Sequence, residues 1–454
     1  APGEGQGNPV DNALLLLGDV KLLGDTDFNV EKRTTTLGDQ SEGTISTFTL
    51  SGQVSLYIEG GYLLASMTGF SFTKADMDVV TGNTNLGASG TLANSEILSM
   101  SVDANFFVGT GLEWNTGSKQ FDSSNSTGIT ADGTIEFTSV THQSDTYTAL
   151  STTVDSLQLL GMDSIDLELG GTIQFNKTSR GDDEKIDWAT ATDSNNDPDD
   201  LLANLNVSKA IKLQIINGHG SLNVGPGNVV ATISDTTFTM AEMDVVTGNT
   251  NLGTLTNANV VSLDIGNAAF FAGTGATLDN GVINTDNAIG VSVDGGFTLN
   301  NIKHDGNSYT GMEASIADAS ILGIDTVAIT IGGDLQFNKT SRGDDEKIDW
   351  ATATDSNNDP DDLLANLNVS KAIKLQIING HGSLNVGPGN VVATISDTTF
   401  TMAEMDVVTG NTNLGTLTNA NVVSLDIGNA AFFAGTGATL DNGVINTDNA
   451  IGVS

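Results

Sequence analysis

Apolar and polar residues alternate along much of the chain, and this alternation predicts β-strands that are buried on one face. One such row runs over residues 289–299, another over 327–337, and a matching row over 165–175. Each row has a small or polar residue near its middle, where a long strand needs a bulge or bend to coil. These predicted bulge positions are Gly171, Asn267, Gly295 and Gly333.

The connections between the rows indicate how the strands pair. Residues 224–228 and 323–326 are too short for a parallel crossover and favour antiparallel hairpins. Residues 273–287 form a longer, polar connection, and only 199–210 show a pattern that suits a short helix. We therefore predict an all-β fold: an elongated tandem array of long, mostly antiparallel, bent strands in stacked sandwich-like units. A β-solenoid is the alternative architecture.

Long internal repeats dominate the organisation of the sequence. Residues 174–292 recur letter for letter as residues 336–454, and a motif beginning at Met77, Met243 and Met405 extends the similarity into a diverged first copy. Such self-similarity is typical of repeat architectures. We predict three repeat units at residues 12–163, 164–325 and 326–454. Because the third unit is shorter than the second, we expect the sequence to be part of a longer array.

The composition limits the possible partners. The formal net charge is −40, with 16 basic and 56 acidic residues, so nucleic acid and anionic membranes would repel the surface. There is no cysteine, which excludes disulfides and thiolate metal sites. We expect no membrane insertion, since no stretch approaches the roughly 20 apolar residues that a spanning helix needs.

An acidic segment in the second and third units is the best candidate for a metal site. Oxygen-bearing side chains occupy alternate positions, a spacing that lets them converge on one calcium ion. The candidate ligands are Asp193, Asn195, Asp197 and Asp199, with their copies Asp355, Asn357, Asp359 and Asp361. The first repeat, residues 12–163, lacks this segment, so the fold does not require it. A solvated loop with an Asx turn is the alternative.

A second polar motif recurs in all three units. The copy in the second repeat, residues 164–325, contains Asp244, Asn249 and Asn251, and their side chains could also hold a cation. A turn stabilised by the asparagine side chains explains the same pattern equally well. Both interpretations remain open at the level of sequence.

The sequence gives little support for catalysis. The four histidines are isolated, and none of the common hydrolase, nucleotide-binding or metalloprotease motifs occurs. We predict that the protein is not an enzyme. A β-helical enzyme acting on polysaccharide is the remaining catalytic alternative.

The verbatim repeats, the acidity, the lack of cysteine and the alternating strands rich in Gly, Asn, Asp and Thr together resemble the large tandem-repeat extracellular proteins of bacteria. That group includes giant adhesins and matrix fibres. The resemblance implies an extracellular or cell-surface location and calcium-dependent rigidity. We predict a non-catalytic structural protein that forms a rod or filament, with copies of itself as partners. The alternatives are a spacer stalk of a calcium-dependent adhesin and contact with a surface polysaccharide.

Overall fold

The computed structural model describes most of the chain. The described residues are 13–17, 20–37, 42–58, 63–87, 89–111, 113–115, 120–122, 125–162, 164–181, 184–193, 201–202, 205–225, 227–324, 326–355, 363–387, 389–441 and 443–454. Internal contacts divide the chain into two compact units, Ala1–Gly218 and His219–Ser454. The division falls within one strand, β12 (Ile211–Val224), and each unit is described by itself.

The first unit is built from long strands that follow one another along the chain. They are β1 (Ala13–Leu17), β2 (Val20–Thr36), β3 (Glu42–Ile58), β4 (Leu63–Val80), β5 (Thr91–Thr110), β8 (Thr127–His142), β9 (Asp145–Leu160) and β10 (Ile165–Thr178). Each pairs antiparallel with the next in this order. Its described residues also form the short strands β6 (Glu113–Asn115), β7 (Gln120–Asp122) and β11 (Thr192–Asp193) and the first part of β12.

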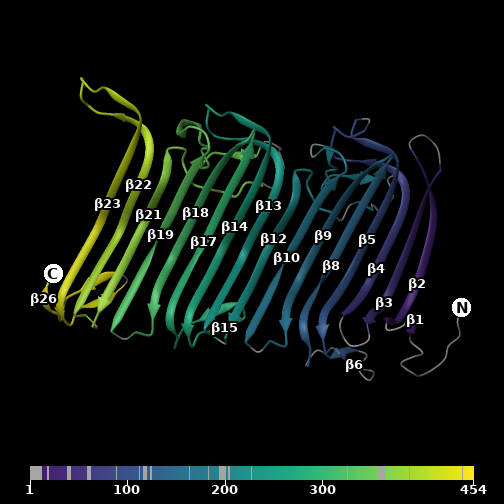
Figure 1. Cartoon of the computed structure of the whole chain (residues 1–454), viewed down its shortest axis with the longest axis horizontal. Helices are drawn as coiled ribbons and strands as arrows, with labels where there is room; N and C mark the ends of the chain where they lie inside the picture. The colour runs from purple at the N-terminus through teal and green to yellow at the C-terminus, as the bar shows by residue number, and fades with distance from the viewer. Residues whose placement is uncertain are drawn as a thin grey trace. The chain divides into compact units, whose positions relative to one another are not determined.

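The second unit repeats this arrangement (Figure 1). Its long strands are β13 (Val229–Val246), β14 (Thr254–Thr274), β17 (Ile289–His304), β18 (Asn307–Leu322), β19 (Val327–Thr340), β21 (Ile373–Val386), β22 (Val391–Val408) and β23 (Thr416–Thr436). They too pair antiparallel in order, and β26 (Ile451–Val453) pairs with the end of β23. The short elements are β15 (Thr277–Asp279), β16 (Val282–Asn284), β20 (Thr354–Asp355), β24 (Thr439–Asp441), β25 (Val444–Asn446) and the 3-10 turn η2 (Asp344–Glu346).

These pairings confirm the predicted all-β fold of long antiparallel strands. The expected hairpins join β12 to β13 and β18 to β19 at the predicted residues. A solenoid would stack successive coils in parallel, whereas all the strand pairings of the described residues in each unit are antiparallel. The division into three repeats is a property of the sequence and remains a prediction for the structure.

The predicted bulges are also confirmed. The pairing register shifts around Asn267, Gly295 and Gly333 in the second unit and at Gly171 in the first. Gly333 has a φ of +143°, a conformation that other residues rarely adopt. A further shift on β18 follows Ile316, which lies opposite both Gly295 and Gly333, so the bulges of the second unit form one line across its sheet.

Two kinds of segment cover the sheet of the second unit and form its cores. Near one end of the strands, the hairpin of β15 and β16 packs Leu278 and Ile283 against buried Val230 and Phe271. Near the other end, the chain between β19 and β21 supplies buried apolar side chains. In the first unit, the described part of the predicted short helix (201–202 and 205–210) is turn and irregular chain rather than helix. Leu202 and Leu205 are buried without helical geometry.

Candidate functional site

The turn between β13 and β14 is a compact structure held by its own side chains. We call residues 247–253 the acceptor turn. Thr247 Oγ1 donates a 2.7 Å hydrogen bond to Gly253 O, and the Asn249 side-chain oxygen accepts one of 3.0 Å from Asn251 N. Gly253 N donates to Asn249 O over 2.9 Å. These bonds form an Asx-type turn and leave the Asn249 amide nitrogen directed outward.

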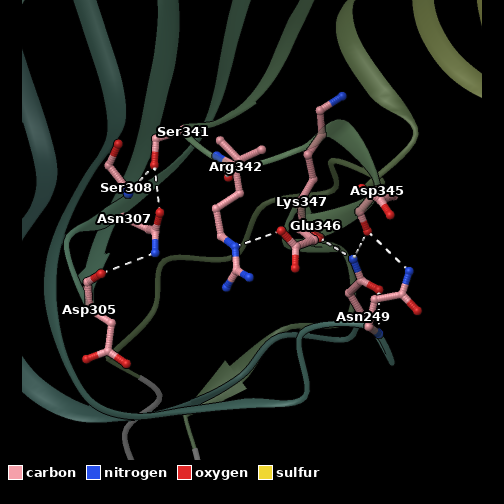
Figure 2. A network of polar contacts seen from close by, with 11 residues as sticks. Asn249, Asp305, Asn307, Ser308, Ser341, Arg342, Asp345, Glu346 and Lys347 are labelled. Atoms are coloured by element: carbon pink, nitrogen blue, oxygen red, sulfur yellow. Dashed lines mark hydrogen bonds and ion pairs between the residues drawn. The ribbon is translucent and has the colours of Figure 1, made fainter.

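A distant segment of the chain binds this turn. We call residues 341–355 and 363–372 the clasp; residues 356–362 between them lie outside the described part. Asn249 Nδ2 donates to Lys347 O over 2.6 Å and to Asp345 O over 3.0 Å. Figure 2 shows the Asn249 amide pointing at the clasp backbone. Asp349 N donates in return to Thr247 O over 2.9 Å.

The clasp also extends the sheet. Its strand β20 pairs antiparallel with the end of β13, with Asp355 opposite Val245 and Thr354 opposite Val246. Further along, Ala365 N donates to Ser262 Oγ over 3.2 Å, and Asn300 Nδ2 donates to Ala365 O over 2.7 Å. The clasp is therefore bonded to β13, β14 and β17 as well as to the acceptor turn.

Apolar burial adds to these polar contacts. The apolar clasp side chains that are at most 5% exposed are Ile348, Trp350, Leu363, Leu364, Leu367 and Val369. The Trp350 indole donates to Asn338 Oδ1 over 3.1 Å, and Asn338 Nδ2 donates to Ile348 O over 2.9 Å. Asn338 on β19 thus satisfies both the buried indole and the clasp backbone, which a buried polar side chain requires.

Ion pairing shapes the start of the clasp. Arg342 Nε lies 2.7 Å from Glu346 Oε2 (Figure 2). The pKa of the Arg342 guanidinium is raised by the neighbouring Tyr309 side chain and by the charge of Glu346, so the guanidinium stays charged. Ser308 N donates to Ser341 Oγ over 3.0 Å, which ties the same region to β18. Exposed pairs of this kind contribute little stability by themselves, so we assign them a positioning role.

The first unit contains the same arrangement, made by residues 81–87, which have the sequence of residues 247–253, and by residues 184–193, which have the sequence of residues 346–355. Asn83 Nδ2 donates to Lys185 O over 2.7 Å, across 102 residues of chain. Asp187 N donates to Thr81 O over 2.9 Å, and β11 pairs with the end of β4. Trp188 donates to Asn176 as Trp350 does to Asn338. The two units therefore contain two copies of one contact between an acceptor turn and a clasp.

Two of the eight predicted calcium ligands, Asp193 and Asp355, lie in described strands. Asp193 is on β11 and Asp355 on β20, where Asp355 Oδ2 accepts a 3.0 Å bond from Leu363 N. The other candidates lie outside the described residues: Asn195, Asp197, Asp199, Asn357, Asp359 and Asp361. Within the described residues, no three His, Asp or Glu side chains gather as a metal site.

The asparagine motif has the role of a turn. Asp244 Oδ1 accepts from Asn257 N over 2.8 Å, and Asn249 and Asn251 direct their amide nitrogens at the clasp. The recurrence of this motif was visible in the sequence. Its partner was not, because nothing in the local pattern connects Asn249 to a lysine carbonyl 98 residues away.

A hollow of about 500 Å³ lies between the β15–β16 hairpin and the line of bulges. Its lining includes Ser234, Asn267, Val282 and Asp294. Asp294 faces Asp318 across the β17–β18 ladder. Burial, and to a lesser extent the charge of Asp318, raise the pKa of Asp294. The hollow therefore contains a carboxyl group that is harder to ionise than usual.

Comparison with models of protein families gives no match for this sequence, and comparison with curated proteins gives none either. Among the described residues, no helix is long and apolar enough to cross a membrane.

Proposed function

We propose that this protein is a non-catalytic structural repeat protein that forms an extended extracellular rod or filament. The observation that carries the proposal is the contact between acceptor turn and clasp, which occurs once in each unit. In both, the clasp binds a turn about 100 residues earlier in the chain. In both contacts, the turn is thereby completed by a clasp from a later part of the repeat array.

This arrangement suits a protein whose stability comes from neighbouring repeats. In such arrays the free energy of folding is the sum of the stability of each repeat and of the interfaces between neighbouring repeats. Repeats can therefore be added without a change in the core. Verbatim copying of residues 174–292 as 336–454 preserves both sides of the contact at once. Duplication lengthens a structural array, whereas a catalytic site does not need a second identical copy of itself.

The charge of the chain fits the same role. A net charge of −40 would keep neighbouring rods apart at low ionic strength, and salt would screen that repulsion. We include calcium in the proposal as a ligand of the acidic part of the clasp, beginning at Asp193 and Asp355. There it would reduce the repulsion between carboxylates and stiffen the contact.

Negative-stain electron microscopy of the purified protein, with calcium and then with a chelator, tests the proposal. Extended particles or fibres are expected, and their loss on chelation would assign the metal a structural role. Discrete rods of fixed length in both conditions would favour the stalk of an adhesin, in which these units act as spacers. A compact globule in both conditions would contradict the proposal.

A further inference from the structure

The second unit contains two copies of the acceptor turn, and among its described residues only the first copy binds a clasp. The turn between β22 and β23, residues 409–415, has the same sequence as residues 247–253. Figure 1 shows this turn, in yellow, standing clear of the irregular segments that cover the β13–β14 turn. The two turns thus differ in occupancy and share their local sequence.

The open turn is already folded for binding. Thr409 Oγ1 donates to Gly415 O over 2.6 Å, Asn413 N donates to Asn411 Oδ1 over 2.9 Å, and Gly415 N donates to Asn411 O over 2.8 Å. These are the bonds that organise residues 247–253. In the described part of the chain, Asn411 Nδ2 has no hydrogen-bond partner, whereas Asn249 Nδ2 has two.

The surface beside the open turn is apolar and exposed. Met405 is 40% exposed and Leu417 is 44% exposed, whereas their copies Met243 and Leu255 are each 3% exposed. A Cβ atom on Gly248 would lie 2.1 Å from Thr352 of the clasp, but one on Gly410 would meet nothing within 4 Å. The exposed surface is therefore the one that a clasp covers in the occupied copy.

The end of β22 offers the same backbone edge. In the occupied copy, Val245 and Val246 pair with Asp355 and Thr354. Their copies Val407 and Val408 pair on one side with β23, and Val408 is 80% exposed. An unpaired edge of this kind is suited to adding a further strand.

We propose that residues 405–417 bind a polypeptide segment with the clasp sequence, that of residues 341–369, contributed by a further copy of the repeat. The Asn411 amide would donate to the carbonyls equivalent to those of Asp345 and Lys347, and Thr409 O would accept from the amide equivalent to that of Asp349. This inference rests on the proposed structural function, because it takes the binding partner to be another repeat of the same array.

The absence of cysteine makes disulfide trapping a direct test. In the occupied copy, Asn251 Nδ2 lies 3.5 Å from Asp345 O. Asn413 is the counterpart of Asn251, so the variant Asn413→Cys places a single thiol at the open turn. The probe is a synthetic peptide of residues 341–369 that carries Asp345→Cys, incubated with the full chain in a glutathione buffer. The yield of mixed disulfide is measured by mass spectrometry.

The matched control is Asn251→Cys, which places the same thiol in the same local sequence at a turn that is already occupied. We expect Asn413→Cys to trap the peptide at least about fivefold better than Asn251→Cys, because binding raises the effective concentration of the two thiols. A peptide of scrambled sequence, with its cysteine at the same position, should lose this preference.

A second variant tests the role of the Asn411 amide. Asn411→Asp in the Asn413→Cys chain keeps the oxygen that organises the turn and removes the amide donor, so the trapping yield should fall to that of the scrambled peptide. Equal yields at positions 413 and 251, or no effect of Asn411→Asp, would overturn the inference. Because electron microscopy measures particle shape independently, failure of the trapping leaves that test of the proposed function intact.

Discussion

The side chain of Asn249 donates a 2.6 Å hydrogen bond to the main-chain oxygen of Lys347, 98 residues further along the chain. Asn249 is 2% exposed, so neither group can turn to water if the bond is lost. An unsatisfied buried donor or acceptor costs about 1–3 kcal/mol. The acceptor turn and the clasp are therefore coupled: each satisfies polar groups that the other buries.

Loss of the Trp350 indole should release the clasp. Trp350→Ala removes a nearly buried side chain and its bond to Asn338, and such truncations cost about 3–5 kcal/mol. Lys347, which is 1% exposed, should then become a trypsin site. Limited proteolysis under native conditions, followed by mass spectrometry, would detect cleavage after Lys347 in the variant and protection in the parent chain. Equal protection in both would show that Trp350 does not hold the clasp.

A methyl group at Gly333 should strain the line of bulges. Gly333 has a φ of +143°, and a Cβ atom there would lie 3.0 Å from Gly380 Cα. We expect Gly333→Ala to lower the free energy of unfolding by about 1–3 kcal/mol, measured by denaturant titration. Gly343→Ala is the matched control, since its Cβ would meet only the mobile end of the Asp345 side chain. If Gly343→Ala lowered the free energy of unfolding as much as Gly333→Ala does, this explanation would be contradicted.

The Asp294–Asp318 pair should make stability depend on pH. Burial and Asp318 raise the folded-state pKa of Asp294 above its unfolded value of about 3.9. The charged form therefore destabilises the fold at neutral pH, and this penalty disappears as the pH falls through the raised pKa to below the unfolded value. Asp294→Asn should stabilise the protein at pH 7 by about 0.5 kcal/mol, and the gain should vanish near pH 3.

The first unit supplies the control for this effect. Asp132, the counterpart of Asp294, lies opposite Ser156 rather than a second carboxylate. Asp132→Asn should therefore give a smaller gain at pH 7 in the same denaturant titration. Equal gains from the two variants would show that Asp318 is not responsible.

The strands and their bulges were predictable because both depend on local pattern. Alternation over residues 289–299 and 327–337 fixes which face of each strand is buried, and a glycine in such a row has few structural roles besides a bulge. Short connections such as 323–326 then leave only an antiparallel return. Each of these inferences used a window of fewer than about 20 residues, well within the range of local rules.

The clasp was not predictable from such windows. Its acidic stretch suggested a solvated loop or a calcium site, yet Ile348, Trp350 and Leu364 on either side of that stretch are buried. The recurrence of Asn83, Asn249 and Asn411 indicated that the turn has a structural role. Its partner is a main-chain carbonyl, and every residue type has one, so the residue type at that position does not reveal the contact. Contacts of this kind leave little trace in a single sequence.

The most direct test of the clasp compares one substitution at two copies of an identical motif. Asn249→Asp and Asn411→Asp both keep the oxygen that organises the turn and remove the amide donor. Hydrogen exchange of residues 341–355, followed by mass spectrometry, measures how firmly the clasp is held, provided that the peptides begin at or before Asp334 and so differ in mass from the identical copy at residues 174–193. We predict that Asn249→Asp weakens protection of the clasp by about 2–3 kcal/mol, whereas Asn411→Asp changes it by less than about 0.5 kcal/mol. Unchanged protection in Asn249→Asp, or an equal loss in both variants, would contradict the claim that this contact joins successive repeats.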